Sequence, residues 1–151
     1  MRLLLLAVGK AKGSPEQVLF DHYAKRLPWA LDVIEIEERR PLAGPERKAR
    51  EAELLLAKLP KSAFLVALDP AGEALSSEAF AKKFSKWQEC GRDLVFVIGG
   101  ADGLGDAVLD RSDQKLSLGA MIWPHLLVRT LLAEQVWRAF SILTNHPYHR
   151  G

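Results

Sequence analysis

Four short apolar runs constrain the fold more than any other feature of the chain. They lie at Leu3–Val8, Val33–Ile36, Ala63–Leu68 and Leu94–Ile98, and only the second contains a charge, at Glu35. A strand with one solvated face alternates between polar and apolar residues, whereas a strand covered on both faces does not. The runs therefore predict a mainly parallel β-sheet with helices on both faces.

Helical patterns lie between these runs. Ser14 followed by Pro15 is a helix-start signal, and we expect the helix to end near Lys25. Ser76-Ser77-Glu78 is a second start signal, for a helix that Gly91 closes. The other expected elements are a helix at 45–58, a short helix ending near 110, an extended piece at 114–118 and a long helix at 125–141. Strand and helix alternate throughout, which indicates one α/β domain over residues 1–151.

The composition indicates the cellular compartment in which the protein works. The single cysteine, Cys90, excludes an intramolecular disulfide and suits a reducing compartment. The apolar start at Leu3–Val8 is shorter than the core of a signal peptide, and no run approaches the length of a membrane span. The formal net charge of +2 does not by itself indicate a partner. We expect a cytoplasmic protein that does not enter the membrane.

A glycine-dense segment, Gly99–Gly105, follows the fourth run and is called the glycine loop below. Such a turn lets backbone N–H groups approach a ligand closely. Its spacing differs from the G-x-G-x-x-G pattern of dinucleotide-binding folds, and no Gly-Lys-Ser/Thr of a phosphate loop is present. A nucleotide-dependent oxidoreductase would also need a fitting acidic residue about twenty positions further on, and this sequence has none there. The pattern is equally consistent with a ligand loop and with a tight structural turn.

A second segment, Leu118–Trp123, combines apolar residues with Gly119 and carries no charge. It would suit an adenosine ring that packs on aliphatic side chains and bonds to backbone atoms. It would not suit a phosphate, which requires donors and positive charge. Taken alone, the segment also fits an ordinary piece of hydrophobic core.

The chain ends in a cluster of polar and aromatic residues, Thr144–Arg150. His146, Tyr148 and Arg150 are suited to RNA, because aromatic rings stack on bases and arginine binds phosphate. A polar chain end without a function and a non-catalytic RNA-binding module are the alternatives.

Metal binding by the histidines is a further alternative. His125, His146 and His149 are without Asp, Glu or Cys at ligand spacing, and Pro147 prevents a regular helix from presenting the last two on one face. We therefore expect no metal, which counts against a metal hydrolase.

Together these segments resemble one family. The resemblance covers the whole chain and rests on the following stretches: Leu6–Lys10, Leu68–Gly72, Ile98–Gly100 with Asp102–Leu104, Leu116–Leu118, Pro124–His125 with Leu127–Arg129, Leu132–Gln135 with Arg138–Ala139, and Thr144–Arg150. The family is RlmH, the bacterial large-subunit rRNA pseudouridine N3-methyltransferases of the SPOUT superfamily. The chain departs from the family pattern at Ala101 and Leu126, where proline is common, and at Gly119, where serine is usual.

The resemblance implies a C-terminal trefoil knot that binds S-adenosylmethionine, a homodimer, and 23S rRNA within the ribosome as the partner. The implied donor pocket consists of Leu68, Gly99, Leu118, Gly119, Ala120, Met121, Ile122 and Trp123.

The acceptor nitrogen of a pseudouridine must lose a proton, which suggests a nearby base. We expect His149 or Tyr148 to take this role, and Arg129 and Arg150 to hold a phosphate or the base carbonyl. His146 and Arg150 are the expected RNA contacts. The alternative function is a non-catalytic RNA- or nucleotide-binding module of the large ribosomal subunit.

Overall fold

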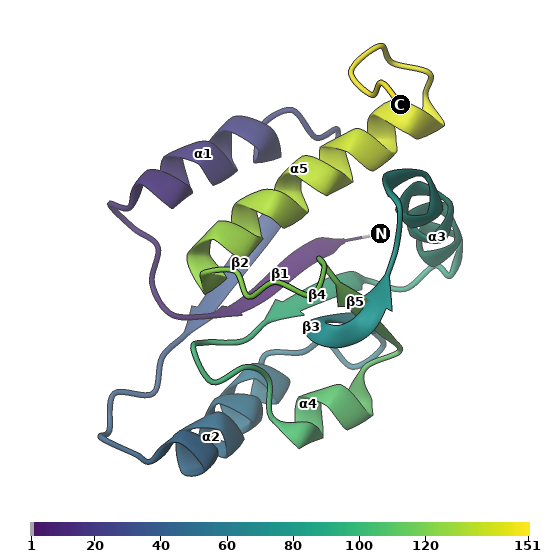
Figure 1. Ribbon diagram of the computed structural model, residues 1–151. Helices are drawn as coiled ribbons and strands as arrows, with labels where there is room; N and C mark the ends of the chain where they lie inside the picture. Colours follow the sequence, from purple (N-terminus) through teal and green to yellow (C-terminus); the bar gives the residue numbers. More distant parts are fainter. Residues whose placement is uncertain (1) are drawn as a thin grey trace.

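The computed structural model describes residues 2–151 and contains a five-stranded, fully parallel sheet (Figure 1). The strands are β1 (Leu3–Val8), β2 (Leu31–Ile36), β3 (Phe64–Ala74), β4 (Leu94–Ile98) and β5 (Gln114–Ser117). Their order across the sheet is β2-β1-β4-β3-β5. The predicted parallel sheet is therefore confirmed, and the predicted bounds of its first and fourth strands agree with the structure.

Helices cover both faces of this sheet (Figure 1). They are α1 (Pro15–Ala24), α2 (Gly44–Ala57), α3 (Ser77–Glu89), α4 (Asp106–Arg111) and α5 (His125–Leu143). Along β1, Leu3 and Leu5 belong to the core formed with α1, α3 and α5, whereas Leu4 and Leu6 belong to the core formed with α2 and α4. Successive strand residues point to opposite faces, so a strand between two cores has to be apolar throughout.

Two of the helices, α1 and α3, begin at a serine that caps the first turn. Ser14 Oγ accepts a hydrogen bond from the Gln17 N–H at 3.1 Å, and Ser76 Oγ accepts one from Ala79 N–H at 3.1 Å. Each serine satisfies a backbone donor that the first helical turn leaves free. Both start signals in the sequence are therefore confirmed.

β3 is longer than its apolar run. The strand was expected to end at Leu68, but it continues to Ala74 after a register shift, so that Leu68 and Glu73 both pair with Leu116 of β5. Gly72 lets β3 resume its pairing with β5 after the shift, because a Cβ there would lie 2.7 Å from the carbonyl carbon of Lys115. The residues after Leu68 do not form an apolar run, so the sequence does not indicate this extension. They belong to the strand because they pair with β5, not because they line a buried face.

Among residues 2–151, no helix is long and apolar enough to cross a membrane. The trefoil knot implied by the family resemblance stays a prediction.

Candidate functional site

Two loops and the irregular part of β3 meet at one edge of the sheet. β4, β3 and β5 are adjacent and parallel, so their carboxyl ends meet there. In open α/β sheets, ligands bind in the crevice outside the carboxyl ends of the strands. The glycine loop follows β4 at this edge, the Leu118–Trp123 segment follows β5, and β3 between them has its register shift directly after Leu68. The structure thus brings together the segments expected to bind the methyl donor.

The glycine loop forms a tight turn. A Cβ at Gly99 would lie 2.6 Å from the carbonyl carbon of Gly103, and Gly103 itself has a φ of +81°. The Gly103 N–H donates to the Gly100 carbonyl at 3.0 Å and closes the turn. Backbone packing alone accounts for Gly99 and Gly103, so their spacing does not identify a ligand.

Local hydrogen bonds hold the Leu118–Trp123 segment in its conformation. The Gly119 N–H donates to Ser117 Oγ at 3.1 Å, and Trp123 Nε1 donates to the Leu118 carbonyl at 3.4 Å. Three large apolar side chains nevertheless face solvent, with exposed fractions of 75%, 91% and 40%: Met121, Ile122 and Trp123. Apolar patches of this kind are typical of a surface that a ligand or another chain covers.

Arg129 is buried in the second turn of α5, with an exposed fraction of 3%. Its Nη1 donates to the Glu35 carboxylate at 2.5 Å, and Nη2 donates to the carbonyls of Val8 and Gly9 at 3.3 and 3.1 Å. Burial raises the pKa of Glu35, but hydrogen bonds from Arg129 and from the Ala11 N–H outweigh it, so this pKa lies below its ordinary value. In the single chain, Arg129 joins α5 to the ends of β1 and β2.

His125 begins α5 and lies against Gly9. A Cβ at Gly9 would come within 3.2 Å of His125 Nε2, so the glycine leaves room for the imidazole. Burial and the nearby charge of Arg129 lower the pKa of His125. The imidazole is therefore neutral at pH 7.

The C-terminal tail folds back onto the other end of α5. The Trp137 ring lies 5.3 Å from the His146 ring and 5.7 Å from the Tyr148 ring, measured between centroids. The Arg138 guanidinium lies over the Tyr148 ring at 4.8 Å. Arg150 is exposed. The tail is thus a packed aromatic and cationic cluster.

Two groups of the tail differ in their chemistry. Burial and a hydrogen bond to Glu134 raise the pKa of Tyr148 to about 12, so its phenol keeps its proton at pH 7. His149 Nδ1 accepts a hydrogen bond from Arg138 Nη1 at 3.1 Å. In the neutral ring the proton therefore sits on Nε2, which donates to Glu78 at 3.0 Å.

The expected catalytic residues do not form one cluster within a chain. Arg129 is buried against Glu35 and the end of β1. Tyr148 and His149 instead bond to Glu134 and Arg138, five and nine residues further along α5, or about 8 and 14 Å at about 1.5 Å per residue. His125 lies at the start of α5, before Arg129, and is therefore further still from the tail histidines. No group of three or more His, Cys, Asp or Glu in residues 2–151 is placed to hold a metal ion.

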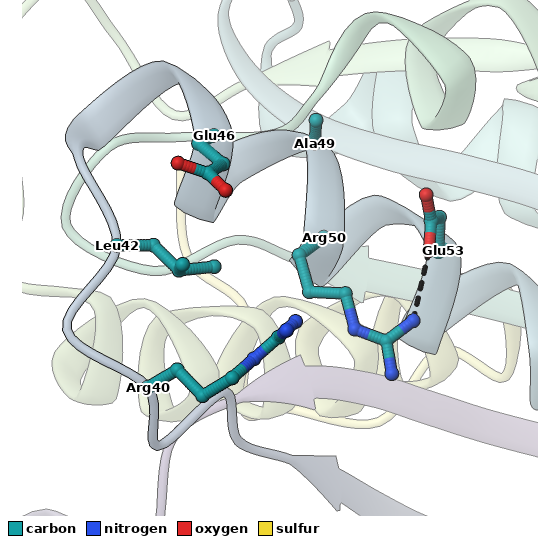
Figure 2. A pocket seen from close by; sticks show the side chains of 6 residues that line it. All are labelled: Arg40, Leu42, Glu46, Ala49, Arg50 and Glu53. Carbon is teal, nitrogen blue, oxygen red and sulfur yellow. Dashed lines mark hydrogen bonds and ion pairs between the residues drawn. The ribbon is translucent and has the colours of Figure 1, made fainter.

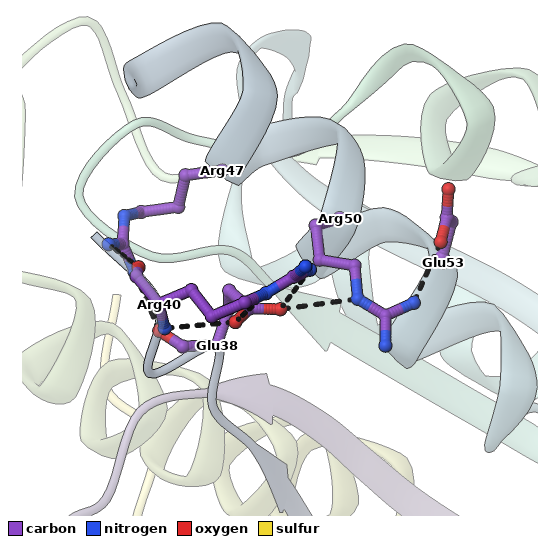
Figure 3. Close-up of polar contacts among 5 residues, drawn as sticks. All are labelled: Glu38, Arg40, Arg47, Arg50 and Glu53. Atoms are coloured by element: carbon purple, nitrogen blue, oxygen red, sulfur yellow. Dashed lines mark hydrogen bonds and ion pairs between the residues drawn. The ribbon is translucent and has the colours of Figure 1, made fainter. Parts of the chain in front are cut away.

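An ion-pair cluster after β2 was not expected from the sequence, which reads there as mixed-charge surface. Glu38 is buried, accepts hydrogen bonds from the side chains of Arg40 and Arg50 at 3.0 and 3.2 Å, and has its backbone carbonyl bonded by Arg47 (Figure 3). The hydrogen bonds from Arg40 lower the pKa of Glu38 to about 2. Its carboxylate therefore ties the segment after β2 to α2.

A surface hollow of about 450 Å³ lies beside this cluster. Figure 2 shows the six residues that line it: Arg40, Leu42, Glu46, Ala49, Arg50 and Glu53. Two guanidinium groups and two carboxylates balance one another, so the hollow offers no net charge to a phosphate. It also lies apart from the expected donor segments in sequence, and we assign it no ligand.

Glu51 was also missed by the sequence reasoning. It lies on α2 with an exposed fraction of 6%, although its neighbours in sequence form a charged surface helix. Burial raises the pKa of its carboxyl, and the charges of Asp102 and Glu38 act in the same direction. Glu51 shares the buried face of α2 with Ala52 and Leu55. Only this position in the helical repeat could have indicated that Glu51 is buried.

Comparison with known proteins defines the class. The family model described as "Predicted SPOUT methyltransferase" matches residues 1–149. A solved structure of ribosomal RNA small subunit methyltransferase E from Neisseria gonorrhoeae, bound to S-adenosyl methionine, has a TM-score of 0.49 and 13% identity, and covers 94% of this chain and 66% of its own. The family match defines this chain as a SPOUT methyltransferase.

Relatives of high identity give the particular family. Ribosomal RNA large subunit methyltransferase H of Paramagnetospirillum magneticum is 60% identical over 99% of both chains. The protein of the same name from Rhodospirillum rubrum is 59% identical over the full length of both. The chain therefore belongs to the ribosomal RNA large subunit methyltransferase H family, which confirms the resemblance seen in its motifs.

Proposed function

We propose that this methyltransferase transfers the methyl group of S-adenosylmethionine to N3 of a pseudouridine in 23S rRNA, within an assembled ribosome. Full-length identity of 60% to a relative named for large-subunit rRNA methylation is the observation that carries the proposal. We further propose that the protein acts in the cytoplasm as a homodimer.

The donor site of this proposal is the carboxyl edge formed by β4, β3 and β5. Its residues are Leu68, Gly99, Leu118, Gly119, Ala120, Met121, Ile122 and Trp123. The exposed apolar side chains at 121–123 suit an adenine ring, and the uncharged loop backbone supplies donors and acceptors for its edge. When bound, S-adenosylmethionine supplies an electrophilic methyl group on a sulfonium.

The acceptor must lose its N3 proton as the new N–C bond forms and the S–C bond breaks. Between the two expected bases, the geometry favours His149. Tyr148 keeps its proton because its pKa is about 12, so it serves as a stacking ring and hydrogen-bond donor. The His149 Nδ1 lone pair accepts from Arg138 in the free chain, and the acceptor N3–H would take the place of that donor.

His146 and Arg150 are the proposed RNA contacts of the tail. Both are exposed, so both are accessible to a large substrate. We propose that Arg129 contributes to the acceptor side of the site by fixing the start of α5.

The active site is proposed to combine two protomers. Arg129 is buried against Glu35 and the end of β1, whereas the tail packs on α5 from Glu134 onward, so one chain does not present both to the same substrate. In a twofold dimer, the tail of one protomer lies against the donor loops of its partner, so each site combines residues of both chains.

Calorimetric titration with S-adenosylmethionine, S-adenosylhomocysteine and NAD tests the donor site. The first two should bind and NAD should not. Binding of NAD, or failure of both adenosyl compounds to bind, would contradict the proposal.

His149→Ala tests the base. Turnover on ribosomes should fall about 10²- to 10⁴-fold, the range of general base catalysis, while donor affinity stays unchanged. His22→Ala, an exposed histidine on α1, is the control and should retain full activity. Unchanged turnover in His149→Ala would remove His149 from the mechanism.

Subunit complementation tests the composite site. One partner carries Ile122→Glu, which alters an exposed donor-loop residue, and the other carries His149→Ala. If sites form across the dimer, random mixing restores about one quarter of normal activity, because half of the dimers are mixed and each has one intact site. If each tail serves its own chain, no activity returns.

The state of the substrate is tested with assembled ribosomes and protein-free 23S rRNA. The small chain offers little surface for naked RNA, so we expect methylation of ribosomes only. Equal rates on both substrates would show that the assembled particle is not required.

A further inference from the structure

The Glu51 carboxyl lies directly behind the glycine loop. Its oxygens Oε2 and Oε1 are 3.5 and 3.6 Å from the position that a Cβ on Gly100 would occupy. The next residue of α2, Ala52, is closer still to the loop, because a Cβ at Gly105 would lie 2.9 Å from the Ala52 methyl group. This part of α2 is thus the support against which the loop packs.

Glu51 does not contribute to folding in an evident way. Its Oε1 is buried and has no hydrogen-bond partner within residues 2–151. A buried carboxyl without a partner destabilises a protein, and an ionised one does so more strongly. An apolar side chain at this position would serve the core better, so a role other than stability is indicated.

We propose that Glu51 is a positioning residue for the methyl donor, holding the glycine loop in its donor-binding conformation through the backbone around Gly100. This inference rests on the proposed donor site, because the loop begins at Gly99. A protonated carboxyl both donates and accepts hydrogen bonds, and the neighbouring polar groups of the loop are peptide N–H and C=O. Gly100 has no side chain to keep the carboxyl away from them.

The surrounding charges favour the protonated form. Burial opposes ionisation of Glu51, and the carboxylates of Asp102 on the loop and Glu38 after β2 oppose it too, whereas Arg47 on α2 favours it. The pKa of Glu51 in the folded chain is therefore above its ordinary value. As the pH rises above that ordinary value, the folded state holds a proton that the unfolded state has released, so the free energy of unfolding falls.

Three variants separate positioning from simple packing. Glu51→Gln keeps the shape and hydrogen bonding but cannot ionise, and Glu51→Leu removes the polar group. Glu53→Gln is the matched control, because Glu53 lies on the same helix, is 67% exposed and pairs with Arg50 at the surface. Affinity for S-adenosylhomocysteine is measured by calorimetry, and the melting temperature by calorimetric scanning, at about pH 6 and about pH 8.5.

We expect stability and affinity to move in opposite directions. Glu51→Leu should melt at or above the unmodified chain at about pH 8.5, yet bind S-adenosylhomocysteine about tenfold more weakly at about pH 6, as for the loss of one buried hydrogen bond that the carboxyl makes to the loop backbone when the donor is bound. Glu51→Gln keeps a donor and an acceptor, so it should bind like the unmodified chain at about pH 6 and at least as tightly at about pH 8.5. Glu53→Gln should behave as the unmodified chain throughout.

Unchanged affinity in Glu51→Leu would overturn the positioning role while leaving the donor site in place. Weaker binding by Glu51→Gln than by the unmodified chain at about pH 6 would also overturn it. Failure of the unmodified chain to bind S-adenosylhomocysteine would instead overturn the proposed function, and the role of Glu51 with it.

Discussion

Replacing Glu35 with glutamine removes the charge that faces the buried guanidinium of Arg129. The carboxylate accepts from Arg129 at 2.5 Å and from the Ala11 N–H at 2.9 Å. Glutamine keeps the size of the side chain but leaves a guanidinium that is 3% exposed without its counter-ion. The substitution therefore tests whether this pair anchors α5 to the sheet.

The size of the effect follows from the burial of the two partners. Breaking a fully buried ion pair costs about 3–5 kcal/mol. The Glu35 side chain is 31% exposed, so water reaches part of it and reduces the loss. The carbonyls of Val8 and Gly9 also continue to accept from Arg129. We expect a loss of about 2 kcal/mol, which for a chain of this length lowers the melting temperature by about 4–8 °C.

The pH dependence makes the prediction specific. Because the pKa of Glu35 is lowered by folding, the stabilisation is present above the ordinary pKa of 4.5 and is lost as the pH falls through the folded-state value. Thermal melting of Glu35→Gln and the unmodified chain should therefore differ at pH 7 and converge as the pH falls below the folded-state pKa of Glu35, which lies under 4.5. Glu37→Gln, whose partner Arg39 is 75% exposed, is the control and should change stability by less than about 0.5 kcal/mol. Equal melting temperatures at pH 7, or a difference that persists in acid, would refute this reasoning.

Three further substitutions address the sheet, the tail and the ion-pair cluster after β2. Gly72→Ala places a methyl group 2.7 Å from the Lys115 carbonyl carbon and should cost about 1–3 kcal/mol in chemical denaturation; an unchanged midpoint would show that the β3–β5 contact is loose. Tyr148→Phe loses the hydrogen bond to Glu134 and should cost about 1 kcal/mol, with a larger loss of turnover on ribosomes if the phenol also contacts RNA. Glu38→Gln should lower the melting temperature at pH 7, and the difference should disappear as the pH falls from 4.5 towards 2, because the stabilising carboxylate has a pKa of about 2; a difference independent of pH would contradict the ion-pair account.

Much of the site could be predicted where local chemistry was sufficient. The uncharged Leu118–Trp123 segment was expected to suit an adenosine ring, and the structure places it at the carboxyl edge with Met121 and Ile122 exposed. The tail was expected to be more than a polar chain end, and it packs its rings on Trp137. These features arise from residue type and position in a short stretch.

Other features depend on residues that are distant in the sequence. Arg129 and Glu35 are 94 positions apart, and nothing in either neighbourhood indicates that they meet. Glu38 and Glu51 stand in mixed-charge stretches that are typical of solvated surface, yet both are buried. Their pKa values shift in opposite directions, because Glu38 accepts hydrogen bonds from two guanidinium groups, whereas burial and the nearby carboxylates of Asp102 and Glu38 oppose ionisation of Glu51.

The sequence by itself determined the elements, the parallel sheet and the helices on both faces. Unbroken apolar runs and helix caps act over a few residues, so Leu3–Val8 and the helix after Ser14 are specified by their own composition. Only the tertiary structure decided the strand order, the return of β3 along β5, and the burial of Arg129 against Glu35, away from the tail. It also decided which carboxylates are ionised, since that depends on burial and on charges brought together by folding.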